Sequence, residues 1–474
     1  MRRTLLLLAL VSVAAGAAVG AQDPSSPTAR LLTELIRLDT SNPPGQEGKI
    51  AELLAPRFRD LGFQVDIVPT PEPGKSHLFA RLKGDGSRRP ILLAAHSDVV
   101  GVEKEKWTVD PFAGVVKDGY VFGRGAIDFK GGLAVFAEAA MMLARNKVPL
   151  ARDVIFLAEA DEEGRPLNTS WLAQNGHWDK MDCEFALNEG GWIIKDAAGR
   201  VKYVSISTAD KGGLSLVLTA RGTSTHSSMP RPDNAIFRLS KALARLADYE
   251  TRPQLTPATR QFFLTLAKTS EPPMSQYFRD LVESPDPKAV ERADKEISKD
   301  PLLHAIMRNT IAPVILNGGF RSNVIPGSAE ATINIRTIPG TDPDALIKEV
   351  QAVIHDPGIE VTLSGGAQAR AYAAATRTTK PSPDDTELYR ALVEQARTVF
   401  PTAEITPYLF QAGTDAGAWR SRGIPVYGIY PYPIDAEDLS RMHGNDERVS
   451  IASLDQGTRM IYETLVKVAA KPGT

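Results

Sequence analysis

A chain of 474 residues is longer than one compact hydrophobic core usually accommodates, so its length predicts two domains. Hydrophobic residues make up 43% of the chain and charged residues 24%, which is ordinary for a globular protein. With 55 Lys and Arg against 57 Asp and Glu, the net charge of −2 argues against partners such as nucleic acid or an anionic membrane. A single cysteine, Cys183, excludes an intrachain disulfide.

The first 21 residues have the pattern of a secretory signal peptide. Arg2 and Arg3 precede an apolar run over residues 5–11, which is followed by small residues that end at Ala21. We predict cleavage after Ala21 and a secreted or periplasmic protein. The alternative is an uncleaved membrane anchor. The apolar stretch is shorter than the ~20 residues that span a bilayer, so we expect no stable membrane span in the mature chain.

Helices and strands alternate over residues 22–209. Apolar spacing predicts helices over Leu31–Leu38, Ile50–Leu61 and Leu133–Asn146. Apolar runs predict strands over Phe63–Val68, His77–Leu82, Ile91–Ala95, Val154–Ala158 and Phe185–Leu187. This alternation is typical of an α/β fold, in which helices flank a sheet. We assign these residues to the first part of a larger domain.

The pattern changes over residues 210–370, which we assign to a second, α+β domain. Its predicted strands and helices are Leu214–Ala220, Asn234–Tyr249, Ala329–Ile335, Pro343–Ile354 and Ile359–Leu363, with a polar helical insertion over Arg252–Asn309. The α/β pattern returns over residues 371–474, with helix Glu387–Val399, strand Val426–Ile429 and helix Ser453–Ala469. The second domain is therefore predicted to be inserted into the first.

Polar side chains follow several of the predicted strands at the point where each strand ends. They are His96, Asp98, Asp161, Glu162, Glu163, Glu189 and His443, joined by Asp128 at a helix start. In open α/β sheets, sites form outside the carboxyl ends of the strands, so these groups can meet. So many carboxylates in one place are costly without cations. Imidazole and carboxylate ligands favour two zinc ions, with cobalt or manganese as alternatives.

Taken one at a time, these residues have ordinary structural interpretations. Asp128 alone reads as a helix N-cap, and Glu162 with Glu163 reads as a solvated acidic loop. On spacing alone, His226 is an exposed loop histidine and Arg336 is a surface arginine in a salt bridge. The placement of the strand-end residues at one edge of a sheet is what favours a site.

The motifs of the chain resemble those of the dinuclear zinc amidohydrolases, a family that includes aminoacylase, glutamate carboxypeptidase, carboxypeptidase S and succinyl-diaminopimelate desuccinylase. The matching segments run in family order from about residue 30 onward: His96-Ser97-Asp98, Gly123 to Gly131, Asp161-Glu162-Glu163, Asn188-Glu189-Gly190, Gly222 to Pro230, Asn323 to Pro326, Gly413 to Ala416 and His443-Gly444. The resemblance implies a zinc-exopeptidase-like mixed sheet flanked by helices, with a ferredoxin-like lid and dimerisation domain.

The resemblance also implies a metal-ligand set. His96, Asp128 and Glu189 would hold one ion. Asp128, Glu163 and His443 would hold the other, with Asp128 as the bridge. By the same resemblance, the zinc ions activate a water molecule for attack on an amide carbonyl. Asn188 stands where many members of the family have aspartate, which leaves the ligand Glu189 intact.

Further roles follow from the same resemblance. Glu162 would be the general base and then the acid, Asp98 would orient His96, and His226 would stabilise the oxyanion, often from the neighbouring subunit of a homodimer. Arg336 would grip the free carboxylate of the substrate. Two further substrate contacts would be Asn323 and the backbone of Gly413.

Two features favour the branch of carboxypeptidase S and the secreted N-acyl amino acid hydrolases. One is the segment Trp107 to Phe112, and the other is the helical insertion before Gly318. The sequence thus predicts a secreted metal-dependent hydrolase that cleaves N-acyl amino acids or the C-terminal residue of short peptides. Two alternatives remain open, a dipeptidase or aminopeptidase with the same metals and a catalytically inactive relative that only binds its ligand.

Overall fold

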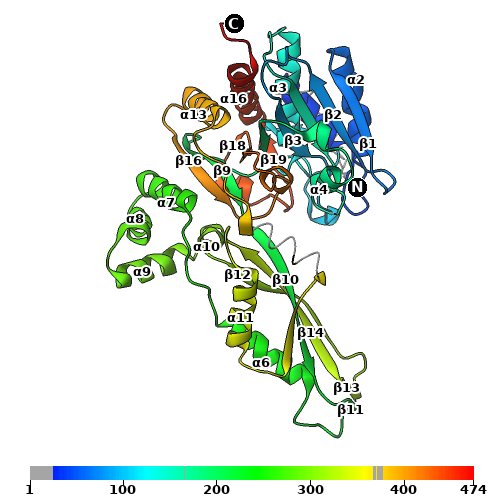
Figure 1. The fold of residues 1–474 in the computed structure, drawn as a ribbon, viewed down its shortest axis with the longest axis vertical. Coiled ribbons are helices and arrows are strands. Elements are labelled where there is room, and N and C mark those ends of the chain that lie inside the picture. Colours follow the sequence, from blue (N-terminus) through cyan, green and yellow to red (C-terminus); the bar gives the residue numbers. More distant parts are fainter. Residues whose placement is uncertain (1–24, 165, 367–369, 371–376, 474) are drawn as a thin grey trace, which may run out of the picture.

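The computed structural model describes residues 25–164, 166–366, 370 and 377–473. The predicted signal peptide lies outside these ranges. The chain forms a large body around one sheet and a smaller elongated body around another (Figure 1). In the described part of the chain, no helix is long and apolar enough to cross a membrane.

The large body is built on a mixed sheet of ten strands among the described residues. In order across the sheet these are β1 (Gln64–Pro69), β2 (Ser76–Leu82), β6 (Val154–Glu159), β3 (Ile91–His96), β7 (Phe185–Asn188), β17 (Val426–Gly428), β9 (Val201–Asp210), β8 (Ile193–Lys195) and β18 (Pro433–Ile434), while β16 (Glu404–Phe410) also pairs with β9. The central strands β6, β3, β7 and β17 run parallel to one another. Their carboxyl ends therefore meet at one edge.

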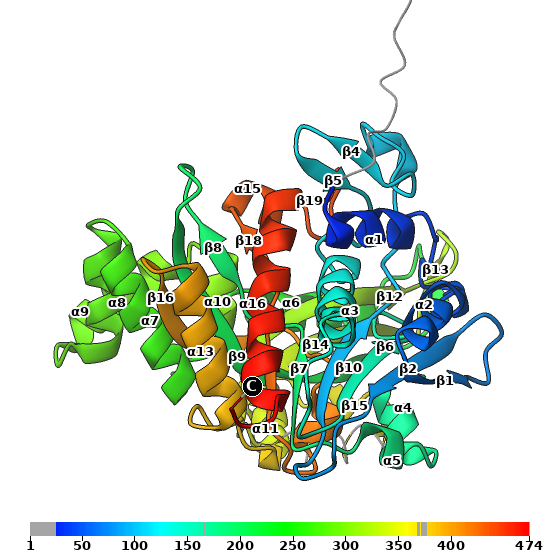
Figure 2. The ribbon, with the colours of Figure 1, turned by 90° about the horizontal axis from the view of Figure 1, so that it is seen from above.

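Helices cover both faces of this sheet. Ile91, Leu93 and Ala95 of β3 point into one core, and Leu92 and Ala94 point into the core on the other face. The first core is closed by α1 (Pro27–Ile36), α2 (Gly48–Asp60), α3 (Lys130–Arg145), α13 (Glu387–Val399) and α16 (Ile451–Ala469), of which α13, α16 and α3 lie in a row (Figure 2). The second core is closed by α4 (Thr169–Gln174), α5 (Trp178–Met181) and α14 (Gly417–Arg420).

Short elements complete the large body. A small antiparallel sheet joins β4 (Val115–Lys117), β5 (Tyr120–Phe122) and β19 (Arg448–Ser450), next to the 3₁₀ turn η1 (Lys104–Lys106) and helix α15 (Ala436–Leu439). The pairing of β5 with β19 brings two distant parts of the chain together. The glycine-rich segment that begins at Gly123 and the segment that contains His443 thus lie against each other.

The smaller body has the ferredoxin-like arrangement that we expected. Its elements in chain order are β10 (Gly212–Arg221), α6 (Ala235–Ala247), β12 (Thr310–Gly318), β14 (Ser328–Thr337), α11 (Pro343–Ile354) and β15 (Ile359–Leu363). The strands lie in the order β12-β14-β10-β15 and are all antiparallel. Apolar residues of α6 and α11 pack on the sheet and close a separate core. A two-stranded ribbon, β11 (Thr225–His226) with β13 (Val324–Ile325), extends the far end.

The helical insertion differs from our expectation in where it packs. Its helices are α7 (Pro257–Thr269), α8 (Met274–Glu283), α9 (Pro287–Ile297) and α10 (Pro301–Met307). Three of its prolines stand at the first helical position after a capping Thr or Asp, where the missing N–H costs nothing. We grouped this segment with the smaller domain, but Phe262 and Phe263 of α7 join the core of the large sheet, beside β9 and β16. The other domain boundaries stay predictions.

Lys211 marks the crossing from the large sheet to the smaller one. It stands between β9 and β10, and it is almost fully buried. Its ammonium donates to the carbonyl oxygens of Ala305 and Arg308, each at 2.7 Å, at the carboxyl end of α10. Burial, together with the nearby guanidinium groups of Arg336 and Arg308, lowers the pKa of Lys211 to about 7. The crossing point is therefore tied to the helical insertion.

Candidate metal centre

The predicted ligands come together at the carboxyl edge of the large sheet. His96 ends β3, Glu163 follows β6, Glu189 follows β7, and Asp128 stands just before α3. His443 arrives from the loop before β19. Five residues separated by almost 350 positions thus converge because parallel strands deliver their ends to one side.

Asp128 lies between the two histidines. Its Oδ1 is 3.1 Å from His96 Nε2, and its Oδ2 is 3.0 Å from His443 Nε2. Glu189 Oε2 is 3.5 Å from the same His96 nitrogen, and Glu163 Oε1 is 3.0 Å from the same His443 nitrogen. Each histidine thus faces one carboxylate of its own and one oxygen of Asp128, which is the arrangement of two sites with a shared bridge.

The donor set fits divalent cations. In the described residues, the carboxylates of Asp128, Glu163 and Glu189 form ion pairs with histidine but not with lysine or arginine. Single ligand atoms of His96, Asp128 and Glu163 all lie within 4.8 Å of one another. Hydrogen bonds to Asp128 and Glu163 raise the pKa of His443 to about 10, and burial raises the pKa of Glu189 to about 7. The cluster attracts positive charge, as a metal site should.

Asp98 supports the turn that carries the two glutamates. Its Oδ1 accepts the backbone N–H of Glu162 at 3.1 Å, and its Oδ2 accepts that of Glu163 at 3.0 Å. The contact with His96 differs from the predicted one. The backbone carbonyl of Asp98 lies 3.0 Å from His96 Nδ1, whereas the nearest carboxylate oxygen is 3.6 Å away. Asp98 thus contacts the His96 ring through its main chain and holds the turn of Glu162 and Glu163 through its side chain.

A second group of buried acids lies behind this turn. Glu47, Asp98 and Asp161 bring their carboxylates together, and burial raises the pKa of Glu47 to about 7. Lys75 places its ammonium 2.5 Å from Asp161, and the Asn42 amide donates to both Asp98 and Asp161 at 2.8 Å. Because the ammonium of Lys75 and the amide of Asn42 already satisfy these carboxylates, we interpret this group as a structural support behind the turn.

Glu447 anchors the loop that presents Asp128. Its buried carboxylate accepts three backbone N–H groups of that loop at 2.7 to 3.1 Å and the guanidinium of Arg124 at 2.6 Å. Arg124 also donates to the carbonyl of His443 at 3.2 Å. We did not predict this pair. The signal in the sequence is an acid four positions after His443, but its partners lie more than 300 positions away.

A cleft of about 560 Å³ opens over the metal centre and reaches both sheets. All five predicted metal ligands line the cleft, together with Glu162 and Gly413. From the smaller sheet come Ser215, Asn334 and Arg336. A cleft of this size accommodates a small ligand between a polar end and the metal centre.

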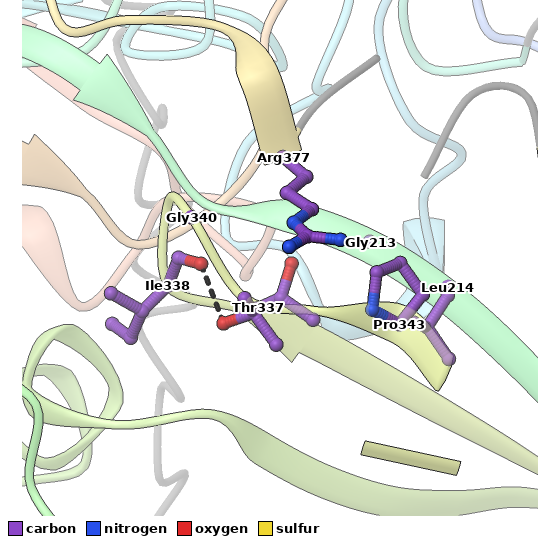
Figure 3. A pocket seen from close by; sticks show the side chains of 8 residues that line it. Gly213, Leu214, Thr337, Ile338, Gly340, Pro343 and Arg377 are labelled. Carbon is purple, nitrogen blue, oxygen red and sulfur yellow. Dashed lines mark hydrogen bonds between the residues drawn. The ribbon is translucent and has the colours of Figure 1, made fainter. Parts of the chain in front are cut away.

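Arg336 lies on the side of the cleft formed by the smaller sheet, where it can contact a ligand. It stands on β14 opposite Gly213, and a Cβ on Gly213 would lie 3.5 Å from its guanidinium. Among the described residues, Arg336 forms no ion pair with a protein carboxylate. Beside it, a hollow of only about 10 Å³ is lined by Gly213, Thr337 and Arg377 (Figure 3). Arg377 instead pairs with Asp342 at 3.0 Å.

His226 and Asn323 lie away from this cleft. Both are exposed on the ribbon at the far end of the smaller body (Figure 1), where the carbonyl of Asn323 accepts the N–H of Ser227 at 3.0 Å. His226 Nδ1 accepts the backbone N–H of Ser228 at 3.2 Å, which leaves Nε2 to carry the ring proton. The ring can therefore donate a hydrogen bond through Nε2, but His226 does not line the cleft over the predicted ligands.

The chain is similar to several hydrolases. The model of Peptidase family M20/M25/M40 matches residues 92–467. Human N-fatty-acyl-amino acid synthase/hydrolase PM20D1 is 28% identical over 400 residues, which cover 82% of this chain and 76% of that protein. Probable carboxypeptidase S-like 2 of Dictyostelium discoideum is 30% identical over 389 residues, which cover 80% of this chain and 72% of that protein.

Solved structures show the same fold. The M20 family metallo-carboxypeptidase Sso-CP2 from Sulfolobus solfataricus superposes with a TM-score of 0.67 at 18% identity, over 93% of this chain and 99% of that one. The family match extends over most of the chain and includes the convergent ligands described above. The chain belongs to peptidase family M20/M25/M40, the fold of which here carries the residues of a metal-dependent hydrolase.

Proposed function

We propose that the protein is a secreted or periplasmic hydrolase that releases the carboxyl-terminal amino acid from N-acyl amino acids or short peptides. The observation that carries this proposal is Arg336, the guanidinium of which lies in the same cleft as the metal centre and forms no ion pair with the described residues. A guanidinium binds a carboxylate through two parallel hydrogen bonds, so it suits a substrate with a free α-carboxylate. The names of the relatives, a fatty-acyl-amino acid hydrolase and a carboxypeptidase, agree with such substrates.

In the proposed reaction, His96, Asp128, Glu163, Glu189 and His443 hold two divalent ions, most simply zinc. When bound, these ions polarise the scissile carbonyl and lower the pKa of the attacking water. Glu162 accepts the proton of that water and delivers it to the leaving amine nitrogen. Arg336 holds the carboxylate of the departing amino acid, with the Gly413 backbone alongside. Water is thereby added across the amide bond, which yields a carboxylic acid and a free amino acid.

The two alternatives fit the cleft less well. An aminopeptidase or dipeptidase needs a carboxylate for the free ammonium of its substrate. In the described part of the chain, the acids that line the cleft are Asp128, Glu162, Glu163 and Glu189, and each already has a proposed role. An inactive binding relative would have no reason to retain both the base and the complete ligand set. Acetyl-Leu should therefore be hydrolysed faster than Gly-Leu, and hydrolysis of Gly-Leu alone would contradict the proposal.

Replacement of Arg336 by methionine tests the carboxylate grip. We expect KM for acetyl-Leu to rise about 10- to 100-fold, since a hydrogen bond to a charged group contributes about 1.5–3 kcal/mol. For the amide of the same substrate, which has no carboxylate, Arg336→Met should leave KM unchanged. The matched control is Arg377→Met, which removes a neighbouring guanidinium that pairs with Asp342 outside the cleft. An equal effect of Arg336→Met on acid and amide would show that Arg336 does not read the carboxylate.

We further propose that two chains form a homodimer in which His226 of each serves the centre of the other. Large apolar side chains are exposed on β12, the edge strand of the smaller sheet, and on α6 beside it. Leu316 of β12 is 66% exposed, Phe237 of α6 is 67% exposed, and Phe320, just after β12, is 78% exposed. An apolar edge strand is a ready surface for pairing with a second copy. The dimer would account for an oxyanion donor placed far from its own cleft.

Co-expression of two inactive chains tests this arrangement. His226→Ala alone should lower kcat about 10²- to 10³-fold, as removal of an oxyanion donor does. When it is co-expressed with Glu162→Gln, about half of the dimers are mixed and each mixed dimer has one intact centre, so about a quarter of the wild-type activity should return. A chain that sediments as a monomer with full activity, or a mixture that stays inactive, would rule the arrangement out.

A further inference from the structure

Tyr430 places a buried hydroxyl group beside the proposed metal ligands. It follows β17 and lines the cleft, and only 1% of its surface is exposed. Its ring stacks on Trp192 at 4.1 Å between centroids with 10° between the planes. It also meets Phe129 edge-on at 5.1 Å. Contacts on two sides fix the ring, so the position of the hydroxyl is determined by packing.

The hydroxyl contacts two ligands at once. Its oxygen lies 3.1 Å from Asp128 Oδ1 and 3.0 Å from Glu189 Oε2. Both carboxylate oxygens also face His96 Nε2, at 3.1 and 3.5 Å. Tyr430 therefore contacts both carboxylates that are proposed to hold one ion together with His96. It contacts the bridging Asp128 through Oδ1, the oxygen that faces His96.

The other half of the centre has no such support. Asp128 Oδ2 and Glu163 Oε1 both face His443, and among the described residues no hydroxyl group contacts either oxygen. His443 is also more open, since 44% of its side chain is exposed against 2% for His96. The two halves are thus alike in their ligand types but differ in burial and in hydrogen bonding around the ligands.

We propose that Tyr430 is a positioning residue that holds Asp128 and Glu189 in the orientation which the ion on the His96 side requires. The inference rests on the proposed metal centre. A hydrogen bond from a neighbouring group fixes the direction of a ligand carboxylate, and loss of such a bond typically weakens metal binding about 10- to 100-fold. The same contacts make the His96 half the tighter site, because both of its carboxylates are held in advance of binding, whereas on the other side only the shared Asp128 is.

Cobalt titration of the purified, chelator-treated protein tests this role, with the visible absorption of Co²⁺ as the signal. We expect Tyr430→Phe to weaken Co²⁺ binding about 10- to 100-fold on the His96 side. Measured in a His443→Ala background, which keeps only the His96 half, the loss should persist. In a His96→Ala background, Tyr430→Phe should weaken Co²⁺ binding much less, because Tyr430 contacts Asp128 there only through the oxygen that faces away from His443. Phenylalanine keeps the ring that packs on Trp192, so the metal-free variants should unfold at the wild-type temperature.

The matched control is Tyr432→Phe, two residues further on. Tyr432 is equally buried, but its hydroxyl donates to the backbone carbonyl of Ile127 and does not reach a ligand carboxylate. Equal weakening in both backgrounds, or the same loss with Tyr432→Phe, would overturn the proposal. Unchanged binding in Tyr430→Phe would overturn it while leaving the metal centre intact. A wild-type protein that binds no Co²⁺ at all would instead remove the proposed function beneath it.

Discussion

Replacement of Glu162 by glutamine should lower kcat about 10²- to 10⁴-fold, the usual contribution of a general base, while KM and the amount of bound metal stay the same. The amide of glutamine cannot take the proton of the attacking water. The turn itself should not move, because Asp98 holds it through the backbone N–H of Glu162 and not through the side chain. Steady-state kinetics together with metal analysis of the same preparation separate the two quantities.

The neighbouring residue supplies the comparison. Glu163→Gln makes the same chemical change one position later on the same turn, at the side chain that faces His443. It should lose metal as well as activity, whereas Glu162→Gln should lose activity alone. If Glu162→Gln retained full turnover of acetyl-Leu, the proposed mechanism would be wrong. If it lost metal to the same extent as Glu163→Gln, Glu162 would be a ligand instead of the base.

Replacement of Asp128 by asparagine should remove binding of the metal pair. One carboxylate oxygen faces each histidine, at 3.1 and 3.0 Å, and asparagine offers only one oxygen. Its amide N–H₂ would confront a ligand nitrogen or an ion, so the two sites cannot both be occupied. We expect activity to fall at least about 10³-fold, because the attacking water then lacks its activation.

Thermal unfolding measures the same loss without a substrate. Zn²⁺ at about a thousand times its Kd stabilises a folded protein by about 4 kcal/mol, so Zn²⁺ should raise the Tm of the wild type but not of Asp128→Asn. The rise should shrink as the pH falls below about 10, because protons compete with the ion for His443, the pKa of which is raised to about 10 by Asp128 and Glu163. The exposed Asp110, which pairs with Lys104, gives the control Asp110→Asn. Two bound ions in Asp128→Asn would contradict the bridge.

The sequence predicted the parts of the fold that depend on apolar periodicity. The uninterrupted run over Ile91–Ala95 becomes β3, and the spacing over Ile50–Leu61 becomes α2. We missed β9 and β16, which lie side by side in the large sheet. β9 is rich in serine and threonine and β16 contains Pro407, so neither has a strong strand pattern. Their pairing with each other and the cover from α7 stabilise them, and no local pattern reveals such partners.

Part of the candidate site could likewise be predicted from the sequence, and part could not. The ligands could be predicted because His96, Glu163 and Glu189 follow recognisable strand ends and all five residues stand in motifs that resemble those of the family. The structure brings all five together. Glu447, Lys75 and Tyr430 could not be predicted as supports, since their partners lie far away in the chain and depend on packing. Their assigned roles, like those of the ligands, await the variants described above.

The hold of Asp98 on the turn after β6 has a consequence for protein engineering. The carboxylate that positions this turn lies 64 residues before Glu162 in the chain, and its hydrogen bonds to the turn are with main-chain N–H groups. The support is therefore indifferent to which side chains the turn displays. The side chains at positions 162 and 163 can therefore be replaced by other acids, amides or imidazoles that face the cleft, while the backbone of the turn stays in place. A library restricted to these two positions would sample new chemistry on an unchanged scaffold.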